Sequence, residues 1–227
     1  MSDTLAILQN NSNKDNTEDF FRLAPFNPSS QQIQEKALDH LKLSKDDILF
    51  DLGCGDGRLL CHAVQHVPGL RCVGIEIDPV YVERAQRRIH ELLSVEAQSR
   101  MEIRCQDALS VMGTGDETTT IATTITTTSS SDTRHKSISE LTLLDDATAL
   151  YLFVLPKGLQ KLLPILEALV QQRIKQQRTL RILSYMFQIH HGDWEPTLVD
   201  RTAKGGCPIY YYEWNGIEQL PIHARDT

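Results

Sequence analysis

The chain has 227 residues, of which 41% are hydrophobic and 23% charged, proportions that suit one globular α/β domain with a sizeable core. The chain has 23 Lys and Arg residues and 30 Asp and Glu residues, which gives a net charge of −7. This charge argues against binding of nucleic acid over a large surface, because such binding needs many contacts with phosphates. No apolar run approaches the roughly 18 residues of a membrane-spanning helix. We therefore expect no nucleic-acid partner and no membrane span.

The five cysteines include no C-x-x-C pair, and their odd number favours free thiols in a reducing compartment. His62 and His66 lie four residues apart, but no further ligand has matching spacing, so no metal site is predicted. The first residues carry no signal-peptide pattern. A cytoplasmic or nuclear location is the default prediction.

Residues 1–19 are polar and acidic, and they are predicted to be a disordered tail before a single domain at residues 20–227. Ser29 or Ser30 can cap the first helix, whose apolar residues recur at helical spacing up to Leu41.

The next segment, Leu49 to Leu60, organises the whole chain. A strand at residues 48–52 is followed by glycines at every second position and then by a new apolar run. Glycines at positions 53, 55 and 57 let the backbone turn sharply and approach a ligand closely, because no Cβ is in the way. The segment predicts a strand, a tight turn and a helix start, with Asp51 at the end of the strand, where a carboxylate can reach a ligand cation.

Two classes of cofactor use a glycine turn after a first strand. A dinucleotide site has the pattern G-x-G-x-x-G, but Arg58 stands here where its third glycine would be. Carboxylates at Asp51 and Asp56 would also repel a pyrophosphate. A ligand that carries an ammonium group fits the pattern better.

Alternating strands and helices follow along the rest of the chain. Strands are predicted at 71–78, 101–105, 147–154 and 180–187, helices from Pro79 and at 159–175, and a final hairpin from 194–199 and 209–214. Residues 113–140 are dominated by Thr and Ser and are predicted to be a disordered insertion. This order predicts an α/β fold with a doubly wound, mostly parallel seven-stranded sheet and a C-terminal antiparallel hairpin.

Ligands of such a sheet bind at the carboxyl ends of its strands. Asp51, Glu76, Asp107 and Phe153 all stand at or just beyond predicted strand ends. An acid such as Glu76, which closes the second strand, can accept hydrogen bonds from both ribose hydroxyls of a nucleoside, a feature shared with NAD-binding domains.

Several motifs together resemble a known family. The D-L-G-C-G-D-G-R-L block from Asp51 resembles motif I of the class I S-adenosylmethionine (SAM) methyltransferases. With F-N-P-S at 26–29, G-I-E-I-D-P at 74–79, L-F-V-L-P at 152–156, S-Y-M-F at 184–187 and W-E-P at 194–196, the chain is similar to the bacterial Dot1-like methyltransferases. It also resembles the lysine methyltransferases of the ATP synthase c subunit and the adenine nucleotide translocase.

The resemblance implies SAM as the cofactor and assigns roles to residues. Asp51 and the glycines would face the methionine part of SAM, and Asp107 would accept from its adenine amino group. The residues expected to bind the cofactor are Pro28, Ser29, Asp51, Gly53, Cys54, Gly55, Gly57, Glu76, Ile77, Asp107, Ala108 and Phe153. The candidates for the substrate pocket are Phe26, Phe153, Leu155, Pro156 and Tyr185, and no catalytic acid or base is assigned.

The predicted function is SAM-dependent methyl transfer, with a protein lysine as the acceptor. The alternatives are a small-molecule methyltransferase and a catalytically inactive SAM-binding protein, and an NAD-dependent oxidoreductase ranks last. The resemblance also leaves a mitochondrial location open, although no presequence pattern is present.

Overall fold

We describe a computed structural model of the chain, which covers residues 27–111, 144–201 and 206–216. The predicted tail at 1–19, Phe26 and the predicted insertion at 113–140 lie outside the described residues. The helices are α2 (Gln31–Leu41), α3 (Arg58–His66), α4 (Pro79–Leu92), α5 (Val95–Gln98) and α6 (Pro156–Lys175), with 3₁₀ turns η1 (Ala108–Ser110) and η3 (Leu144–Asp146). The strands are β1 (Ile48–Leu52), β2 (Arg71–Glu76), β3 (Met101–Cys105), β4 (Ala149–Leu152), β5 (Leu180–Tyr185), β6 (Leu198–Asp200) and β7 (Ile209–Trp214).

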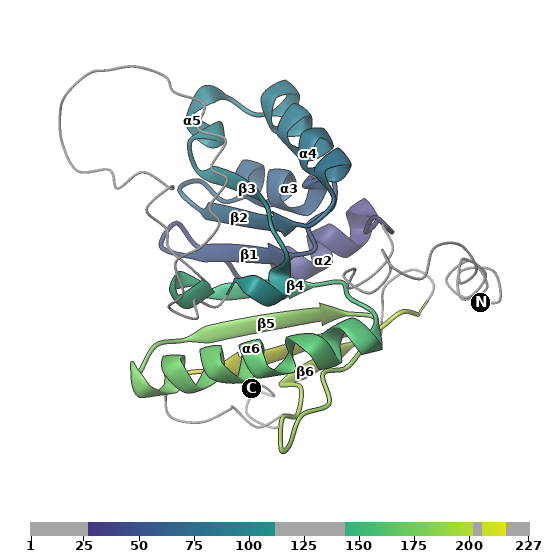
Figure 1. The fold of residues 1–227 in the computed structure, drawn as a ribbon. Coiled ribbons are helices and arrows are strands. Elements are labelled where there is room, and N and C mark those ends of the chain that lie inside the picture. Colours follow the sequence, from purple (N-terminus) through teal and green to yellow (C-terminus); the bar gives the residue numbers. More distant parts are fainter. Residues whose placement is uncertain (1–26, 112–143, 202–205, 217–227) are drawn as a thin grey trace, which may run out of the picture.

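These strands form one seven-stranded sheet in the order β3-β2-β1-β4-β5-β7-β6. The first five strands pair in parallel, and β7 pairs antiparallel with both β5 and β6. Strands β1 to β3 are added in turn towards one edge of the sheet, and β4 and β5 are then added on the other side of β1. As a result, β1 and β4 lie side by side at the centre of the sheet (Figure 1). The predicted sheet and its antiparallel end are confirmed.

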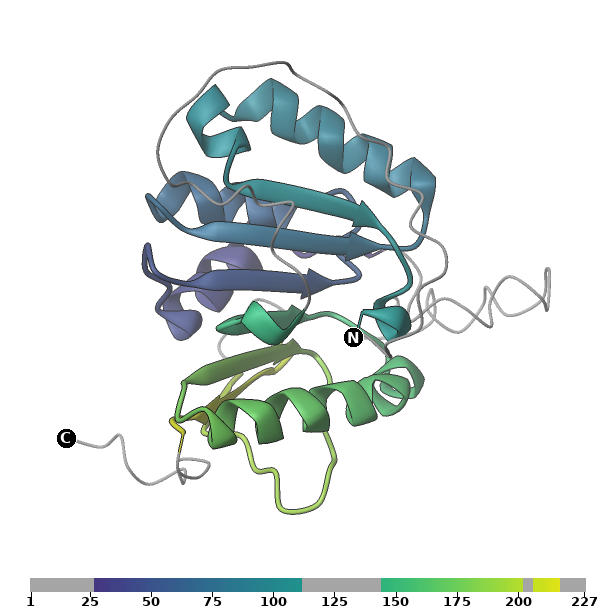
Figure 2. The same ribbon diagram turned by 60° about the vertical axis from the view of Figure 1, so that its left-hand side comes forward.

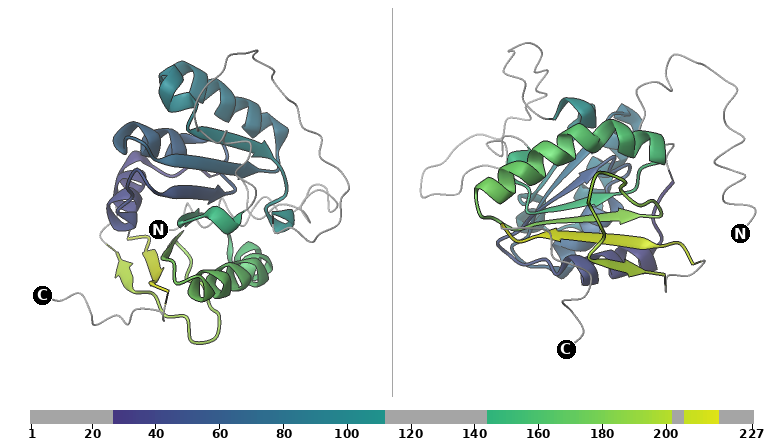
Figure 3. Two further views of the ribbon diagram at one scale, coloured as in Figure 1. Left: turned by 90° about the vertical axis from the view of Figure 1, so that its left-hand side faces the viewer. Right: turned by 90° about the horizontal axis from the view of Figure 1, so that it is seen from below.

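Helices cover both faces of the sheet, as Figures 1 and 3 show. One apolar cluster joins α2 and α3 to one face, with Leu49, Leu60 and Tyr211 fully or almost fully buried. A second cluster joins α6 to the other face through residues such as Phe50 and Leu166. Because β1 is buried on both faces, its five residues are nearly all apolar, and a buried Asp51 among them requires an explanation.

Several element boundaries differ from the prediction. Helix α6 begins at Pro156, three residues before the expected start, because Leu155 is extended and Pro156 takes the first helical position, which suits its fixed φ angle. In the final hairpin only Leu198–Asp200 pairs with β7, and Trp194 instead packs edge-on against Trp214 with ring centroids 4.8 Å apart. The short helix α5, capped by Ser94, was not predicted.

Within the described ranges, no helix has both the length and the apolar character that a membrane crossing requires.

Candidate active site

A pocket is lined by residues of the loops that follow β1, β2, β3 and β4. Figure 2 shows that the arrowheads of these parallel strands all point towards the same end of the sheet. All predicted cofactor residues except Gly57 line the pocket, together with Leu155 from the predicted substrate set. The pocket is further lined by residues that the sequence analysis did not assign to the site, namely Asn27, Asp56, Arg58, Leu59, Ile75, Asp78, Tyr81, Gln106, Tyr151 and Val154.

The glycine turn after β1 is fastened to β2 by its own N–H groups. Gly53 and Cys54 both donate to the carbonyl of Ile75, at 2.8 and 3.0 Å, and Gly55 donates to the Glu76 carboxylate at 2.8 Å. Gly53, Gly55 and Gly57 all have positive φ angles, of 91°, 54° and 70°, which is the conformation that side chains disfavour. These three N–H groups therefore hold the turn against β2 and are not available to a ligand.

Asp51 is the most unusual group in the pocket. Its side chain is almost fully buried, yet no hydrogen bond from any described residue ends on its carboxylate. Burial raises the pKa of this carboxyl well above its usual value, and the negative charges of Glu76 and Asp56 raise it further. Burying a charged carboxylate without a hydrogen-bond partner costs free energy in the ligand-free protein. A cationic ligand in the pocket would provide that partner.

Asp56, by contrast, already has cationic partners. Arg58 donates to both of its oxygens, at 2.9 and 2.6 Å, and Arg88 of α4 donates to one of them at 2.7 Å. Burial opposes ionisation of Asp56, but the bond from Arg58 and the charge of Arg88 outweigh it and lower the pKa of Asp56. Because two arginines offset the charge of Asp56, the argument against a pyrophosphate rests mainly on Asp51.

Glu76 closes β2 and faces the glycine turn. One oxygen accepts from Gly55 N–H and the other from Asp78 N–H, at 2.8 and 2.9 Å. Each carboxylate oxygen has a second lone pair, so Glu76 can still accept hydrogen bonds from the two hydroxyls of a ribose. Its two backbone bonds fix the orientation that such a contact requires.

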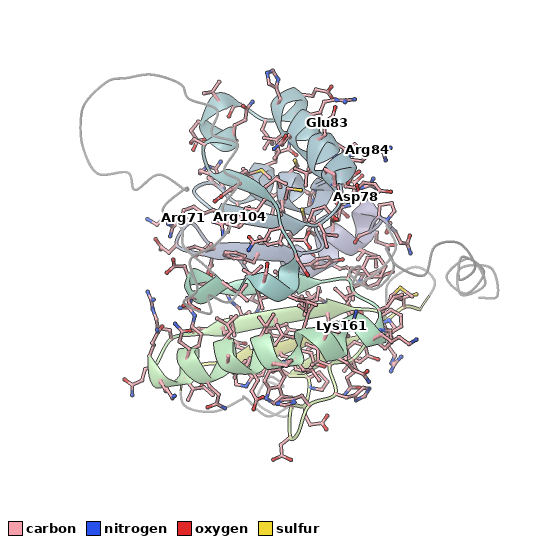
Figure 4. The ribbon with its side chains drawn as sticks, viewed as in Figure 1. Arg71, Asp78, Glu83, Arg84, Arg104 and Lys161 are labelled. Atoms are coloured by element: carbon pink, nitrogen blue, oxygen red, sulfur yellow. The ribbon has the colours of Figure 1, made fainter. Side chains whose placement is uncertain are left out.

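The loops after β2 and β3 complete this part of the pocket. One oxygen of Asp107 caps η1 by accepting from Leu109 N–H at 2.9 Å, which leaves the other oxygen for a ligand. Tyr81, a pocket residue that was not predicted, carries the guanidinium of Arg84 over its ring at 5.1 Å. Figure 4 labels Arg84 on α4 and Asp78, the residue that caps the start of this helix and lines the pocket.

The segment before α2 forms another wall. Asn27, Pro28 and Ser29 line the pocket, and the Ser29 hydroxyl is hydrogen-bonded to the Tyr151 hydroxyl of β4 at 2.7 Å. Sequence reasoning missed Tyr151, because its place inside an apolar strand indicates only burial. The pairing of β1 with β4, which sets Tyr151 beside Asp51, carries no signal in a single sequence.

The predicted substrate residues lie on the β4 and β5 side of the pocket. Phe153 and Leu155 line it, and the ring of Tyr185 lies against that of Phe153 with centroids 4.7 Å apart. Pro156 and Tyr185 do not line the pocket themselves. Met186, directly after Tyr185, has a φ of 70°, a strained conformation for a side-chain-bearing residue that is typical of functional sites.

Replacing Gly57 with Ala tests the packing behind the turn. We expect the free energy of unfolding to fall by about 1–2 kcal/mol from the left-handed backbone alone, and further because the new Cβ would lie 3.0 Å from the Cβ of Ala85. Gly192→Ala is the matched control, since its φ is also positive but no atom lies within 4 Å of the added Cβ. Chemical denaturation measures both, and an equal loss in the two variants would refute the close packing.

Comparisons with known proteins agree on the class. A family model described as a methyltransferase domain matches residues 49–142. The crystal structure of an RNA methyltransferase from Salinibacter ruber in complex with S-adenosyl-L-homocysteine has a TM-score of 0.56 and 25% sequence identity, and the match covers 86% of this chain and 97% of that one.

Two curated relatives match shorter stretches. A protein-lysine N-methyltransferase from Saccharolobus islandicus is 34% identical over 67 residues, and a small RNA 2′-O-methyltransferase from Arabidopsis thaliana is 37% identical over 71 residues. These matches cover 30% and 31% of this chain, but only 42% and 8% of the two relatives. The chain thus spans less than half the length of either protein.

A methyltransferase domain thus matches residues 49–142 of this chain, and the described strands and helices have the α/β fold of the SAM-dependent methyltransferases. The predictions of this class, of its fold and of SAM as its cofactor are confirmed.

Proposed function

We propose that this protein transfers a methyl group from SAM to the side-chain amine of a protein lysine. The observation that carries the first half of the proposal is the buried Asp51 carboxylate, without a partner among the described residues, in the same pocket as Glu76. SAM has a positively charged amino-acid end and a ribose, which are the groups that these two carboxylates would hold. Asp107, with its free oxygen, would take the adenine amino group, and Ile77 and Ala108 would lie against the base.

Bound SAM would supply a methyl group that is electrophilic because it is attached to a sulfonium. The remaining task of the protein is to align the acceptor and to remove water. Phe153, Val154 and Leu155 provide an apolar wall on the β4 side of the pocket, and Tyr185 supports the ring of Phe153. Such a wall disfavours a charged ammonium and so favours the neutral amine that can accept a methyl group.

Two observations favour a protein lysine as the acceptor. The relative from Saccharolobus islandicus is a protein-lysine methyltransferase, and the net charge of −7 gives no general attraction to nucleic acid. An RNA acceptor is the second candidate, because one structural neighbour and one curated relative are RNA methyltransferases. A small-molecule acceptor and an inactive SAM-binding protein are the remaining alternatives.

Incubation of the protein with methyl-labelled SAM and a cell extract tests these candidates together. We expect a labelled polypeptide that resists ribonuclease and yields methyl-lysine on acid hydrolysis. The Asp51→Asn variant, which removes the negative charge while retaining the shape of the side chain, is expected to lose most of the labelling. Label in RNA or in the low-molecular-weight fraction would overturn the lysine assignment, and binding of S-adenosylhomocysteine without any labelling would indicate an inactive protein.

A further inference from the structure

Strand β3 forms one edge of the sheet and pairs with β2 alone (Figures 1 and 2). The carbonyl of Arg100 and the N–H of Gln106, directly before and after β3, are hydrogen-bonded to β2. Because backbone groups alternate in direction along a strand, Met101, Ile103 and Cys105 turn their N–H and C=O groups away from β2. Among the described residues, no hydrogen bond reaches these outward groups. The edge therefore offers a row of unused backbone donors and acceptors.

Two charged side chains lie along this edge. Glu102 and Arg104 form a two-point ion pair at 2.8 and 2.9 Å, and 26% and 19% of their side chains are exposed. They point to the opposite face of β3 from Met101 and Ile103, which pack in the core. A row of like charges would keep the edges of two molecules apart, whereas charges that alternate in sign do not.

A second copy of this chain fits the edge by symmetry. A two-fold axis perpendicular to the sheet would set two β3 strands side by side and antiparallel. The outward groups can bond across such a seam only if the axis passes through a residue and not between two residues. With the axis at Ile103, this residue faces its own copy and Met101 faces Cys105. The residues in each of these pairs exchange both of their backbone hydrogen bonds.

The charges of the strand select this axis over its neighbours. An axis at Glu102 would place two glutamates directly opposite each other, and an axis at Arg104 would do the same with two arginines, so both arrangements are repulsive. An axis at Met101 or Cys105 would leave most of the strand unpaired. An axis at Ile103 sets Glu102 of each copy opposite Arg104 of the other, in the closely spaced type of pair that is not hydrogen-bonded through the backbone.

We propose that two copies of this chain associate through β3, antiparallel and about a two-fold axis at Ile103, so that their two sheets become one continuous sheet. The partner for this edge is thus a second copy of the same chain. Because the two β3 strands run in opposite directions, the two pockets open at opposite ends of the joined sheet. The interface does not depend on the nature of the methyl acceptor.

Sedimentation velocity over a series of concentrations tests this interface. We expect the mass of the unaltered protein to approach twice 25.7 kDa as the concentration rises. Glu102→Arg and Arg104→Glu each place like charges opposite one another at both symmetric positions, so each variant should self-associate about tenfold or more weakly. An equimolar mixture of the two variants should form a dimer again, because one chain then carries two positive charges on β3 and the other two negative charges.

Arg178→Glu is the matched control for the change in net charge. Arg178 is exposed and precedes β5, which lies on the other side of β1 and β4 from the β3 edge. Its replacement should leave the dimer intact. An unaltered protein that stays monomeric at every concentration would refute the proposal. A dimer that survives both single charge reversals, or a mixture of the two variants that remains monomeric, would refute it as well.

Discussion

Asp51→Asn is expected to raise the melting temperature of the ligand-free protein and at the same time to weaken S-adenosylhomocysteine binding by about 10- to 100-fold. The second effect follows from the loss of the charge that would pair with the ligand ammonium. Methylthioadenosine, which has no ammonium group, should bind with unchanged affinity. Calorimetry with both ligands, beside thermal unfolding without ligand, measures the three quantities.

The gain in stability has a defined dependence on pH. The pKa of Asp51 is raised in the folded protein, so the folded state binds more protons than the unfolded state above pH 3.8. The wild-type protein must therefore lose stability as the pH rises from about 3.8 towards the raised folded pKa of Asp51. The asparagine variant does not titrate at this position. Its advantage should be largest at neutral pH and should vanish near pH 4.

Asp47→Asn is a control for which the melting temperature is expected to change in the opposite direction. Asp47 accepts from Ser44 and Thr148 and pairs with Arg181. Burial acts to raise its pKa, but these partners outweigh burial and lower it, so its ionised form stabilises the fold above the unfolded pKa and this contribution is lost as the pH falls. Its asparagine variant should lower the melting temperature and leave ligand affinity unchanged. A fall in stability for Asp51→Asn as well would contradict the account of Asp51 as a group that needs a ligand.

Glu76→Gln is expected to reduce the affinity for S-adenosylhomocysteine and for methylthioadenosine alike, by about 100-fold or more. Both oxygens of Glu76 accept backbone N–H groups, from Gly55 and from Asp78, so the amide nitrogen of glutamine would face a donor on one side. The free energy of unfolding should fall by about 1–3 kcal/mol because one buried donor loses its partner. The ribose contact would be lost for both ligands, since both contain the nucleoside.

Glu102→Gln is the matched control for this change. Glu102 pairs with Arg104 on β3 and does not line the pocket, so its replacement should leave both affinities unchanged. A Glu76→Gln variant that discriminated between the two ligands would place Glu76 at the amino-acid end and overturn the ribose assignment. The two variants thus distinguish two parts of the pocket. The Asp51 variant should affect only the affinity for S-adenosylhomocysteine, whereas the Glu76 variant should affect the affinities for both ligands.

Much of this architecture follows from patterns that are local in the sequence. The residues of β1, its glycine turn and the start of α4 at Pro79 lie where apolar periodicity, glycine spacing and proline chemistry predict them. Glu76 and Asp107 were found as candidates because the carboxyl ends of parallel strands gather at one edge of a sheet. The assigned roles of these residues towards a cofactor remain predictions.

Contacts between distant parts of the chain could not be found in this way. Arg88 lies 32 residues from Asp56, yet its guanidinium donates to that carboxylate. Ser29 and Tyr151 are 122 residues apart, and their hydrogen bond depends on how α2 packs on the sheet. Strand register and helix packing arise from summed contacts over whole faces, and no single short motif encodes them.

By itself, the sequence predicted a strand, a glycine turn and acids at successive strand ends, which are local features, and its motifs resemble those of the class I SAM methyltransferases. Only the tertiary structure decided which of the acids have partners. It gave Asp56 two arginines and left Asp51 buried without a described partner, beside Tyr151. The electrostatic state of a carboxylate depends on its burial and its neighbours, and both are properties of the folded chain.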